Sequence, residues 1–172
     1  IGPYLKCLLD DVFGGGAHFR SAIAWHYYNK LGDRRKRALP SAFDTLYWYV
    51  REPDADFAFQ ALEEPRERPV RQLVRRKVGG RAVNARDAAG RLLDRESTTR
   101  RVDNVWRIPA LTPSARHEWA HFETQKPVAL LERILATFTR PGDLVLDPFL
   151  GSGTPAVAAA RLGRRAVGVD AS

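Results

Sequence analysis

Residues 144–170 read LVLDPFLGSGTPAVAAARLGRRAVGVD, and this stretch decides the fold class. It predicts a short apolar strand, a glycine-containing loop, a small-residue helix and a second short strand, in that order: 144–146, 147–154, 156–162 and 166–169. A fully apolar first strand is typical of a strand buried in a parallel sheet. This succession is the first half of a Rossmann-type nucleotide site, so the predicted fold class is α/β.

The loop in this stretch, DPFLGSGT, favours S-adenosylmethionine over NAD or ATP as its ligand. Gly151 and Gly153 let a ligand approach the backbone closely, because neither carries a Cβ. The loop lacks the third glycine of a dinucleotide fingerprint and the Gly-Lys-Ser/Thr of a phosphate loop. Asp147 would repel a pyrophosphate, whereas it suits an amine or a sulfonium cation. Asp170, at the end of the second strand, can accept hydrogen bonds from both ribose hydroxyls of an adenosine.

Two more helices are predicted outside this unit. Pro127 can stand in the first turn of one of them, where its missing N–H costs nothing. Five apolar residues then mark one face of that helix: Leu130, Leu131, Ile134, Leu135 and Phe138. The other helix covers residues 5–13 and ends at the glycines 14–16; Cys7, near its middle, is expected to be a small buried residue. Between these two helices, strands are predicted at 21–25 and 46–50, and a basic loop is predicted at 29–40.

Composition and charge exclude several classes of protein. The chain has 172 residues and a net charge of +8, with a pI near 10.1, which favours a polyanionic partner such as nucleic acid. No apolar run approaches the roughly 18 residues of a membrane span, and no secretory signal stands at the start. A single cysteine cannot form an internal disulfide. Methionine is absent and the first residue is Ile1, so we expect a fragment of a longer protein.

The positive charge is concentrated in one segment. Residues 66–101 hold twelve basic and four acidic residues, and their net charge equals that of the whole chain. We expect short strands and loops of weak intrinsic order here, with turns at Gly79-Gly80 and at Gly90. The segment is interpreted as a nucleic-acid contact, and a solvated linker is the alternative. Five basic residues are the candidates for phosphate contacts: Arg71, Arg75, Arg76, Lys77 and Arg81.

A metal-binding pattern occurs at residues 117–121, which read HEWAH. On a helix, His117 and His121 would share one face and hold zinc, with Glu118 as the base of a metalloprotease. A loop is expected at this position, so we interpret the pattern as a chance match and predict no metal site. A zinc metalloprotease is kept as an alternative function.

Three elements in a fixed order resemble the DNA amino-methyltransferases, which methylate adenine N6 or cytosine N4. They are TQKP at 124–127, DPFLGSGT at 147–154 and GVD at 168–170. Their position after the basic segment is similar to the circularly permuted β class of that family. Three N-terminal stretches resemble the family too: 4–14, 19–25 and 43–49.

The resemblance implies a partial Rossmann-like, S-adenosylmethionine-dependent methyltransferase fold with an inserted basic target-recognition segment. Residues 1–51 would be the C-terminal part of the catalytic subdomain, 52–105 the insertion and 106–172 the cofactor-binding subdomain. The implied partner is double-stranded DNA in the cytoplasm of a prokaryote, with the target base flipped out of the duplex. A non-catalytic DNA-binding relative is a second alternative.

The resemblance also assigns site residues. Ten positions would bind the cofactor: Thr124, Lys126, Asp147, Pro148, Phe149, Gly151, Ser152, Gly153, Thr154 and Asp170. Within this set, Asp170 would hold the ribose, and Lys126 would pair with the carboxylate of the amino-acid moiety. The family's catalytic sequence, an Asp, Asn or Ser followed by Pro-Pro and an aromatic residue, is expected upstream of Ile1, because no Pro-Pro occurs in the chain. We therefore expect no methyl transfer by these 172 residues alone.

Overall fold

A computed structural model describes residues 2–29, 39–115 and 117–171. The chain divides into two compact units: unit 1 is Ile1–Gln60 with Asp103–Ser172, and unit 2 is Ala61–Val102. The insertion predicted at 52–105 is therefore longer at both ends than unit 2. Most of the basic loop predicted at 29–40 lies outside the described residues. No helix among the described residues has the length and apolar character to cross a membrane.

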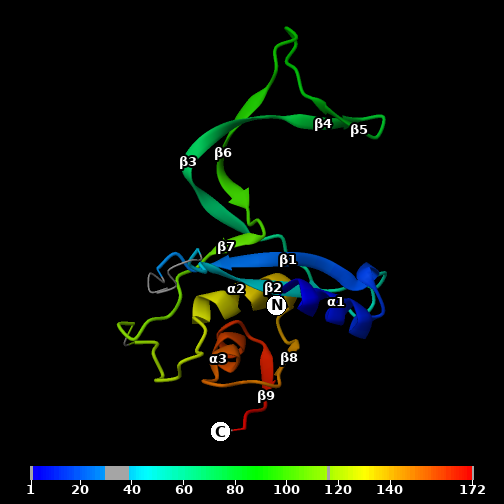
Figure 1. Ribbon diagram of the computed structural model, residues 1–172. Helices are drawn as coiled ribbons and strands as arrows, with labels where there is room; N and C mark the ends of the chain where they lie inside the picture. Colours follow the sequence, from blue (N-terminus) through cyan, green and yellow to red (C-terminus); the bar gives the residue numbers. More distant parts are fainter. Residues whose placement is uncertain (1, 30–38, 116, 172) are drawn as a thin grey trace. The chain divides into compact units, whose positions relative to one another are not determined.

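Unit 1 contains a three-stranded sheet (Figure 1). The central strand, β1 (Phe19–His26), pairs antiparallel with β2 (Phe43–Tyr49) and parallel with β7 (Val105–Arg107). The two strands predicted at 21–25 and 46–50 are confirmed, although β2 begins and ends earlier than expected. Strand β7 was not predicted, because three residues are too few for an alternating pattern to be recognised.

An aromatic cluster joins this sheet to helix α2 (Val128–Phe138), which confirms the predicted helix. The ring centroid of Phe138 on α2 lies 4.4 Å from that of Trp48 on β2 and 6.3 Å from that of Trp106 on β7. Trp106 is only 2 % exposed. Large stacked and tilted rings bury much apolar area, so this cluster fixes α2 on the sheet.

The β–loop–α–β unit predicted at the end of the chain is confirmed. Strands β8 (Leu144–Asp147) and β9 (Arg165–Gly168) are parallel, and helix α3 (Thr154–Arg161) connects them. Ala158 and Ala159 on α3 are fully buried against α2, because small side chains allow the two helices to approach closely. The chain leaves α3 through Gly163, whose φ of +70° lies in the left-handed region that glycine adopts at helix ends.

One prediction for this unit is wrong. Strand β8 is not buried on both faces, since Leu144 and Leu146 are 57 % and 65 % exposed. Val145, between them, packs against the α2–α3 core. The apolar run therefore has one face on the helices and one face exposed among the described residues. An uninterrupted apolar strand indicates two faces that can be covered, but it does not supply the covering layer.

Helix α1 (Gly2–Phe13) and the short 3-10 turn η1 (Gly16–His18) begin unit 1. The helix ends as predicted, because Gly14 and Gly15 both have positive φ angles. Cys7 is exposed, so its predicted burial is wrong, and no residue of α1 is buried. The helix is attached to β2 through the Tyr47 hydroxyl, which donates to the Gly2 carbonyl at 2.9 Å, and through Tyr49, described below. Polar attachment on one side leaves the other sides of the helix exposed.

Unit 2 consists of two antiparallel strand pairs (Figure 1). The long pair is β3 (Glu63–Leu73) with β6 (Asp94–Arg101), and the short pair is β4 (Arg75–Val78) with β5 (Arg81–Asn84). The predicted strands and turns are present, although β3 is longer than expected, and the β3–β6 ladder is interrupted by a shift in register between Pro65 and Val70. Prolines lack the N–H that a ladder needs, which accounts for the irregularity there. The weak intrinsic order of this segment stays a prediction.

The predicted turn at Gly79-Gly80 is confirmed. It joins β4 to β5 as a two-residue connection in which both glycines have positive φ, +57° and +79°. This is the requirement of a type I′ hairpin turn, whose twist matches that of the flanking strands.

Candidate functional site

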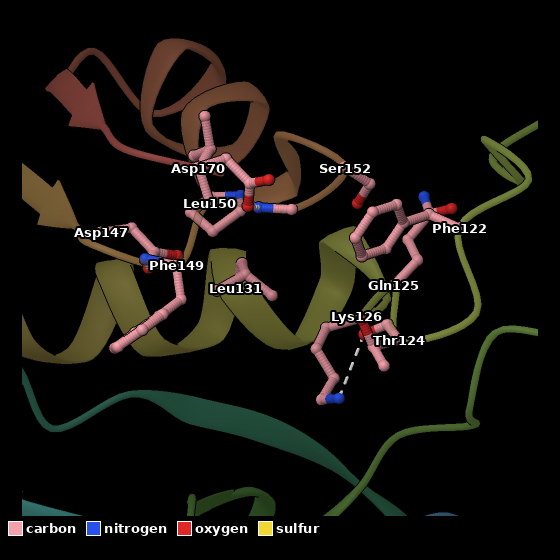
Figure 2. Close-up of a pocket in the computed structure, with 12 residues that line it drawn as sticks. Phe122, Thr124, Gln125, Lys126, Leu131, Asp147, Phe149, Leu150, Ser152 and Asp170 are labelled. Atoms are coloured by element: carbon pink, nitrogen blue, oxygen red, sulfur yellow. Dashed lines mark hydrogen bonds between the residues drawn. The ribbon is translucent and has the colours of Figure 1, made fainter. Parts of the chain in front are cut away.

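A pocket of about 310 Å³ lies in unit 1 at the carboxyl end of strand β8 (Figure 2). One wall is the loop between β8 and α3, and the other is the segment that leads into α2. Twelve residues line it: Phe122, Thr124, Gln125, Lys126, Leu131, Asp147, Phe149, Leu150, Gly151, Ser152, Pro155 and Asp170. The carboxyl ends of parallel strands are where open α/β sheets bind their ligands.

Local hydrogen bonds shape the β8–α3 loop. The Asp147 carboxylate accepts the N–H of Phe149 at 2.9 Å, which makes an Asx turn directly after the strand. Gly151 and Gly153 have φ angles of +54° and +79°, and Gly153 is the N-cap of α3. Residues with a Cβ rarely adopt this conformation, so the two glycines are required by the path of the backbone. The Phe149 side chain is 87 % exposed.

Asp170 connects the end of the second strand to this loop. Its Oδ2 accepts the N–H of Gly151 at 2.7 Å. The Leu150 N–H also donates to the Val169 carbonyl at 2.9 Å, so two bonds hold the loop against the chain that follows β9. The Asp170 carboxylate is consequently placed on the pocket wall, where Figure 2 shows it next to Leu150.

The opposite wall carries Thr124 and Lys126, both exposed. The Lys126 ammonium donates to the carbonyl of Thr124 at 3.2 Å. Phe122 closes this side, because a Cβ added to Gly151 would lie only 3.0 Å from its ring. The absence of a side chain at Gly151 therefore serves the packing of Phe122 as well as the backbone conformation.

The structure brings seven of the ten predicted cofactor residues to this pocket: Thr124, Lys126, Asp147, Phe149, Gly151, Ser152 and Asp170. The other three do not line it. Pro148 is exposed and Gly153 caps α3, whereas Thr154 is 3 % exposed with its hydroxyl 3.0 Å from that of Ser152. The cofactor role of the whole set stays a prediction.

Five lining residues are not among the sequence-based predictions: Phe122, Gln125, Leu131, Leu150 and Pro155. Leu131 was recognised as part of the apolar face of α2 but not as a wall of a site. Gln125 lies inside the TQKP element, and this position is the only feature of the sequence that could have identified it as a lining residue. Phe122 carried no local signal, because its contact with Gly151 spans a long stretch of sequence.

The HEWAH sequence at 117–121 forms turns and no helix, as expected. The two histidines therefore do not share a helical face. Glu118 accepts a hydrogen bond from the backbone N–H of Val128 at 2.5 Å, at the start of α2. No group of three or more potential metal ligands occurs in the parts of the chain that the structure describes.

The five basic residues predicted to contact DNA all lie on unit 2 and are exposed. Arg71 is on β3, with its Nε 3.9 Å from a carboxylate oxygen of Asp94 on the paired strand. The other four are on the β4–β5 hairpin, where cross-strand partners share a face. By this register Arg75 and Lys77 project from one face of the hairpin, and Arg76 and Arg81 project from the other.

Comparison with known proteins fits this architecture. Residues 2–172 match the model of a family described as DNA methylase, N6_N4_Mtase. The chain belongs to this family. The predicted resemblance is therefore confirmed over almost the whole chain.

Two curated methyltransferases are similar to part of the chain. Type II methyltransferase M2.DpnII of Streptococcus pneumoniae is 47 % identical over 72 residues, which are 42 % of this chain and 26 % of that protein. Type II methyltransferase M2.MboI of Moraxella bovis is 42 % identical over 67 residues, 39 % of this chain and 24 % of that protein. The chain therefore matches about a quarter of the length of these relatives.

Two solved structures share the fold. The M1.HpyAVI–SAM complex has a TM-score of 0.61 at 21 % identity, and the alignment covers 98 % of this chain and 64 % of that one. The PvuII DNA methyltransferase, described as cytosine-N4-specific, has a TM-score of 0.56 at 17 % identity and coverages of 98 % and 52 %. The predicted α/β, Rossmann-like methyltransferase fold is thereby confirmed.

Proposed function

We propose that this chain is part of a DNA methyltransferase that transfers a methyl group from S-adenosylmethionine to the exocyclic amine of adenine (N6) or cytosine (N4). One observation carries the proposal: the pocket at the end of β8, where Asp147, Asp170 and the glycine loop face Thr124 and Lys126. Membership of the DNA methylase family supports it, as does the similar fold of M1.HpyAVI in its complex with SAM.

The chemistry of the lining residues fits this cofactor. In this role the Asp170 carboxylate would accept hydrogen bonds from ribose hydroxyls, and Asp147 would supply negative charge near the sulfonium and amino groups. The Lys126 ammonium is a partner for the carboxylate of the amino-acid moiety. A volume of about 310 Å³ lies within the range of roughly 300–1,000 Å³ that is usual for small-molecule sites. The bound cofactor would supply an electrophilic methyl group, while these residues hold and orient it.

The target amine needs residues that hold it in line with the methyl group. We propose that the base is flipped out of the duplex and that an Asp/Asn/Ser-Pro-Pro-aromatic sequence outside these 172 residues binds the amine. The 172 residues contain no Pro-Pro pair. Their contribution to the reaction would be the cofactor pocket and the contact with DNA.

The proposed DNA contact is the β4–β5 hairpin of unit 2. A two-stranded ribbon is narrow enough to enter the major groove. We place the DNA against the face that carries Arg75 and Lys77, because Asn84 shares that face and its amide can bond to a base edge. Val78 and Val83 accompany Arg76 and Arg81 on the other face. The setting would be the cytoplasm of a prokaryote, where the chromosome lies.

The cofactor assignment is tested by calorimetry with S-adenosylmethionine on the full natural polypeptide. Asp170→Asn and Asp147→Asn should each weaken binding about tenfold or more, because a hydrogen bond to a charged group contributes roughly 1.5–3 kcal/mol. Asp54→Asn, an exposed position of unit 1 away from the pocket, is the control and should bind as the parent does.

Two results would decide against the proposal. Parental affinity in both pocket variants would show that the pocket is not the cofactor site. DNA binding by the parent without any binding of S-adenosylmethionine would instead identify a non-catalytic DNA-binding relative.

A further inference from the structure

A closed set of side-chain hydrogen bonds precedes helix α2. The Glu118 Oε1 accepts the N–H of Val128 at 2.5 Å. The Gln125 side-chain amide donates to the Glu118 carbonyl at 2.8 Å, and its oxygen accepts the N–H of Ala120 at 2.8 Å. Glu118 and Gln125 thus tie together the two ends of the segment 118–128, and we refer to these two residues as the brace.

Glu118 supplies a hydrogen-bond acceptor that the first turn of α2 lacks. The N-cap of α2 is Pro127, which has no side-chain acceptor, and the first turn contains no acidic residue. Val128 is 8 % exposed, so water has little access to replace a partner for its N–H. A carboxylate at this position also interacts favourably with the positive end of the helix dipole. The glutamate of the HEWAH sequence therefore acts as a helix cap supplied from ten residues upstream.

The segment that the brace ties together forms one wall of the pocket. Phe122, Thr124 and Lys126 all lie within the segment 118–128 that the brace ties together, and they line the pocket (Figure 2). Thr124 and Lys126 are exposed, so burial does not fix their positions. Glu118 and Gln125, by contrast, are both partly buried, and their side chains are hydrogen-bonded to the backbone at both ends of the segment. The path of the backbone at Thr124 and Lys126 consequently depends on the brace.

We propose that Glu118 and Gln125 are positioning residues that hold Thr124 and Lys126 toward the amino-acid moiety of S-adenosylmethionine. This inference rests on the proposed function and extends it to two residues that do not belong to the predicted cofactor set. The brace acts through the wall that it orders, so its removal should weaken contacts to one end of the cofactor and leave the adenosine end as it is.

The experiment compares two ligands by calorimetry on the full natural polypeptide. One is S-adenosylmethionine, and the other is 5′-methylthioadenosine, which lacks the amino-acid moiety. Glu118→Ala should weaken binding of S-adenosylmethionine about tenfold, in line with the removal of one partly buried, charge-assisted hydrogen bond, and change binding of 5′-methylthioadenosine less than twofold. Glu118→Gln keeps an oxygen acceptor for the Val128 N–H and should restore most of the affinity.

Two further variants distinguish the expected effect from misfolding. Gln125→Ala removes two hydrogen bonds of the brace but leaves the cap of α2 in place, so it should show the same selective decrease if Glu118→Ala does not fold. Glu123→Ala removes an exposed glutamate of the same segment that does not line the pocket, and it should bind both ligands as the parent does.

The brace proposal is overturned if the brace variants lose affinity for both ligands equally, since that is the effect of general destabilisation. It is also overturned if they bind S-adenosylmethionine as tightly as the parent. A parent that binds neither ligand would be a different result, because the proposed function itself would then fail and the role of the brace with it.

Discussion

In unit 1 aromatic and aliphatic side chains of the sheet, α2 and α3 form a buried core, whereas in unit 2 most side chains are exposed. Among residues 61–102, all of which the structure describes, Ala85 alone is buried. Unit 2 is held by backbone ladders and by cross-strand ion pairs such as Arg100–Glu64, whose nitrogen and oxygen lie 2.6 Å apart. Its side chains are thus not committed to a core and can serve a partner.

This difference in burial predicts that the same Leu→Ala substitution lowers the free energy of unfolding by very different amounts in the two units. Leu130→Ala on α2 removes a side chain that is 2 % exposed and should lower the free energy of unfolding by about 2–5 kcal/mol. Leu73→Ala on β3 removes one that is 47 % exposed and should cost less than about 1 kcal/mol. Chemical denaturation of both variants measures the contrast. Equal decreases would mean that unit 2 has a core of its own or is covered by another part of the protein.

The elements that were predicted correctly from the sequence are those with a local cause. The β–loop–α–β unit follows from an apolar run, glycines that the loop requires at 151 and 153, and a helix of small residues, all within one short stretch. The hairpin turn at Gly79-Gly80 follows in the same way from the need for two positive φ angles.

The predictions that are wrong concern burial, which depends on what packs from elsewhere. Cys7 and Leu144 lie in apolar patterns, yet both are exposed, because a pattern states which face can be covered and not what covers it. The pocket was predicted mainly from its loop side and from the TQKP element. Phe122 reaches it through space, and Glu118 was interpreted as part of a chance match although it caps α2.

Within unit 2, the two faces of the β4–β5 hairpin are expected to contribute differently to DNA binding. If DNA lies against one face of the hairpin, Arg75→Gln with Lys77→Gln should lower the salt dependence of DNA binding by about two units of slope, because each neutralised phosphate accounts for roughly 0.9 units. Arg76→Gln with Arg81→Gln removes the same charge from the other face and should change the slope by clearly less. Binding isotherms at several salt concentrations provide both slopes.

Equal decreases in the two double variants would contradict a single DNA face and would favour binding on both sides of the ribbon. Parental slopes in both would show that the hairpin does not touch DNA. Neither double variant should alter the free energy of unfolding of unit 1, because the four side chains are exposed and lie on the other unit.

The smallest expected effect concerns helix α1, an element of unit 1 that has no buried residue. A polar contact attaches it to β2, since the Tyr49 hydroxyl donates to Asp10 at 2.8 Å. Lys6, one turn before Asp10 on the same helix, donates to the same carboxylate at 2.7 Å. The bond from Lys6, followed by that from Tyr49, lowers the pKa of Asp10 below its usual 3.8. The bond to Asp10 raises the pKa of Lys6 above 10.5, and burial raises the pKa of Tyr49 above 10.0.

These three shifts give the attachment of α1 a pH dependence on both sides of neutrality. A carboxyl group with a lowered pKa stabilises the folded state above its unfolded pKa, and this contribution disappears as the pH falls below about 4. Groups with raised pKa values contribute below about pH 10 and lose the contribution as the pH rises further. Amide hydrogen exchange in residues 2–13 should therefore be slowest, after correction for intrinsic rates, between about pH 5 and pH 9.

A matched pair of variants isolates the acid side of this dependence. Asp10→Asn removes it, whereas Asp11→Asn, the exposed neighbour, should retain it. A corrected exchange rate in α1 that does not change between about pH 3 and pH 6 in the parent would show that the Asp10 contacts do not hold the helix on the sheet. The apolar contact of Phe13, whose ring is stacked 4.8 Å from that of Tyr49, would then be sufficient to attach the helix.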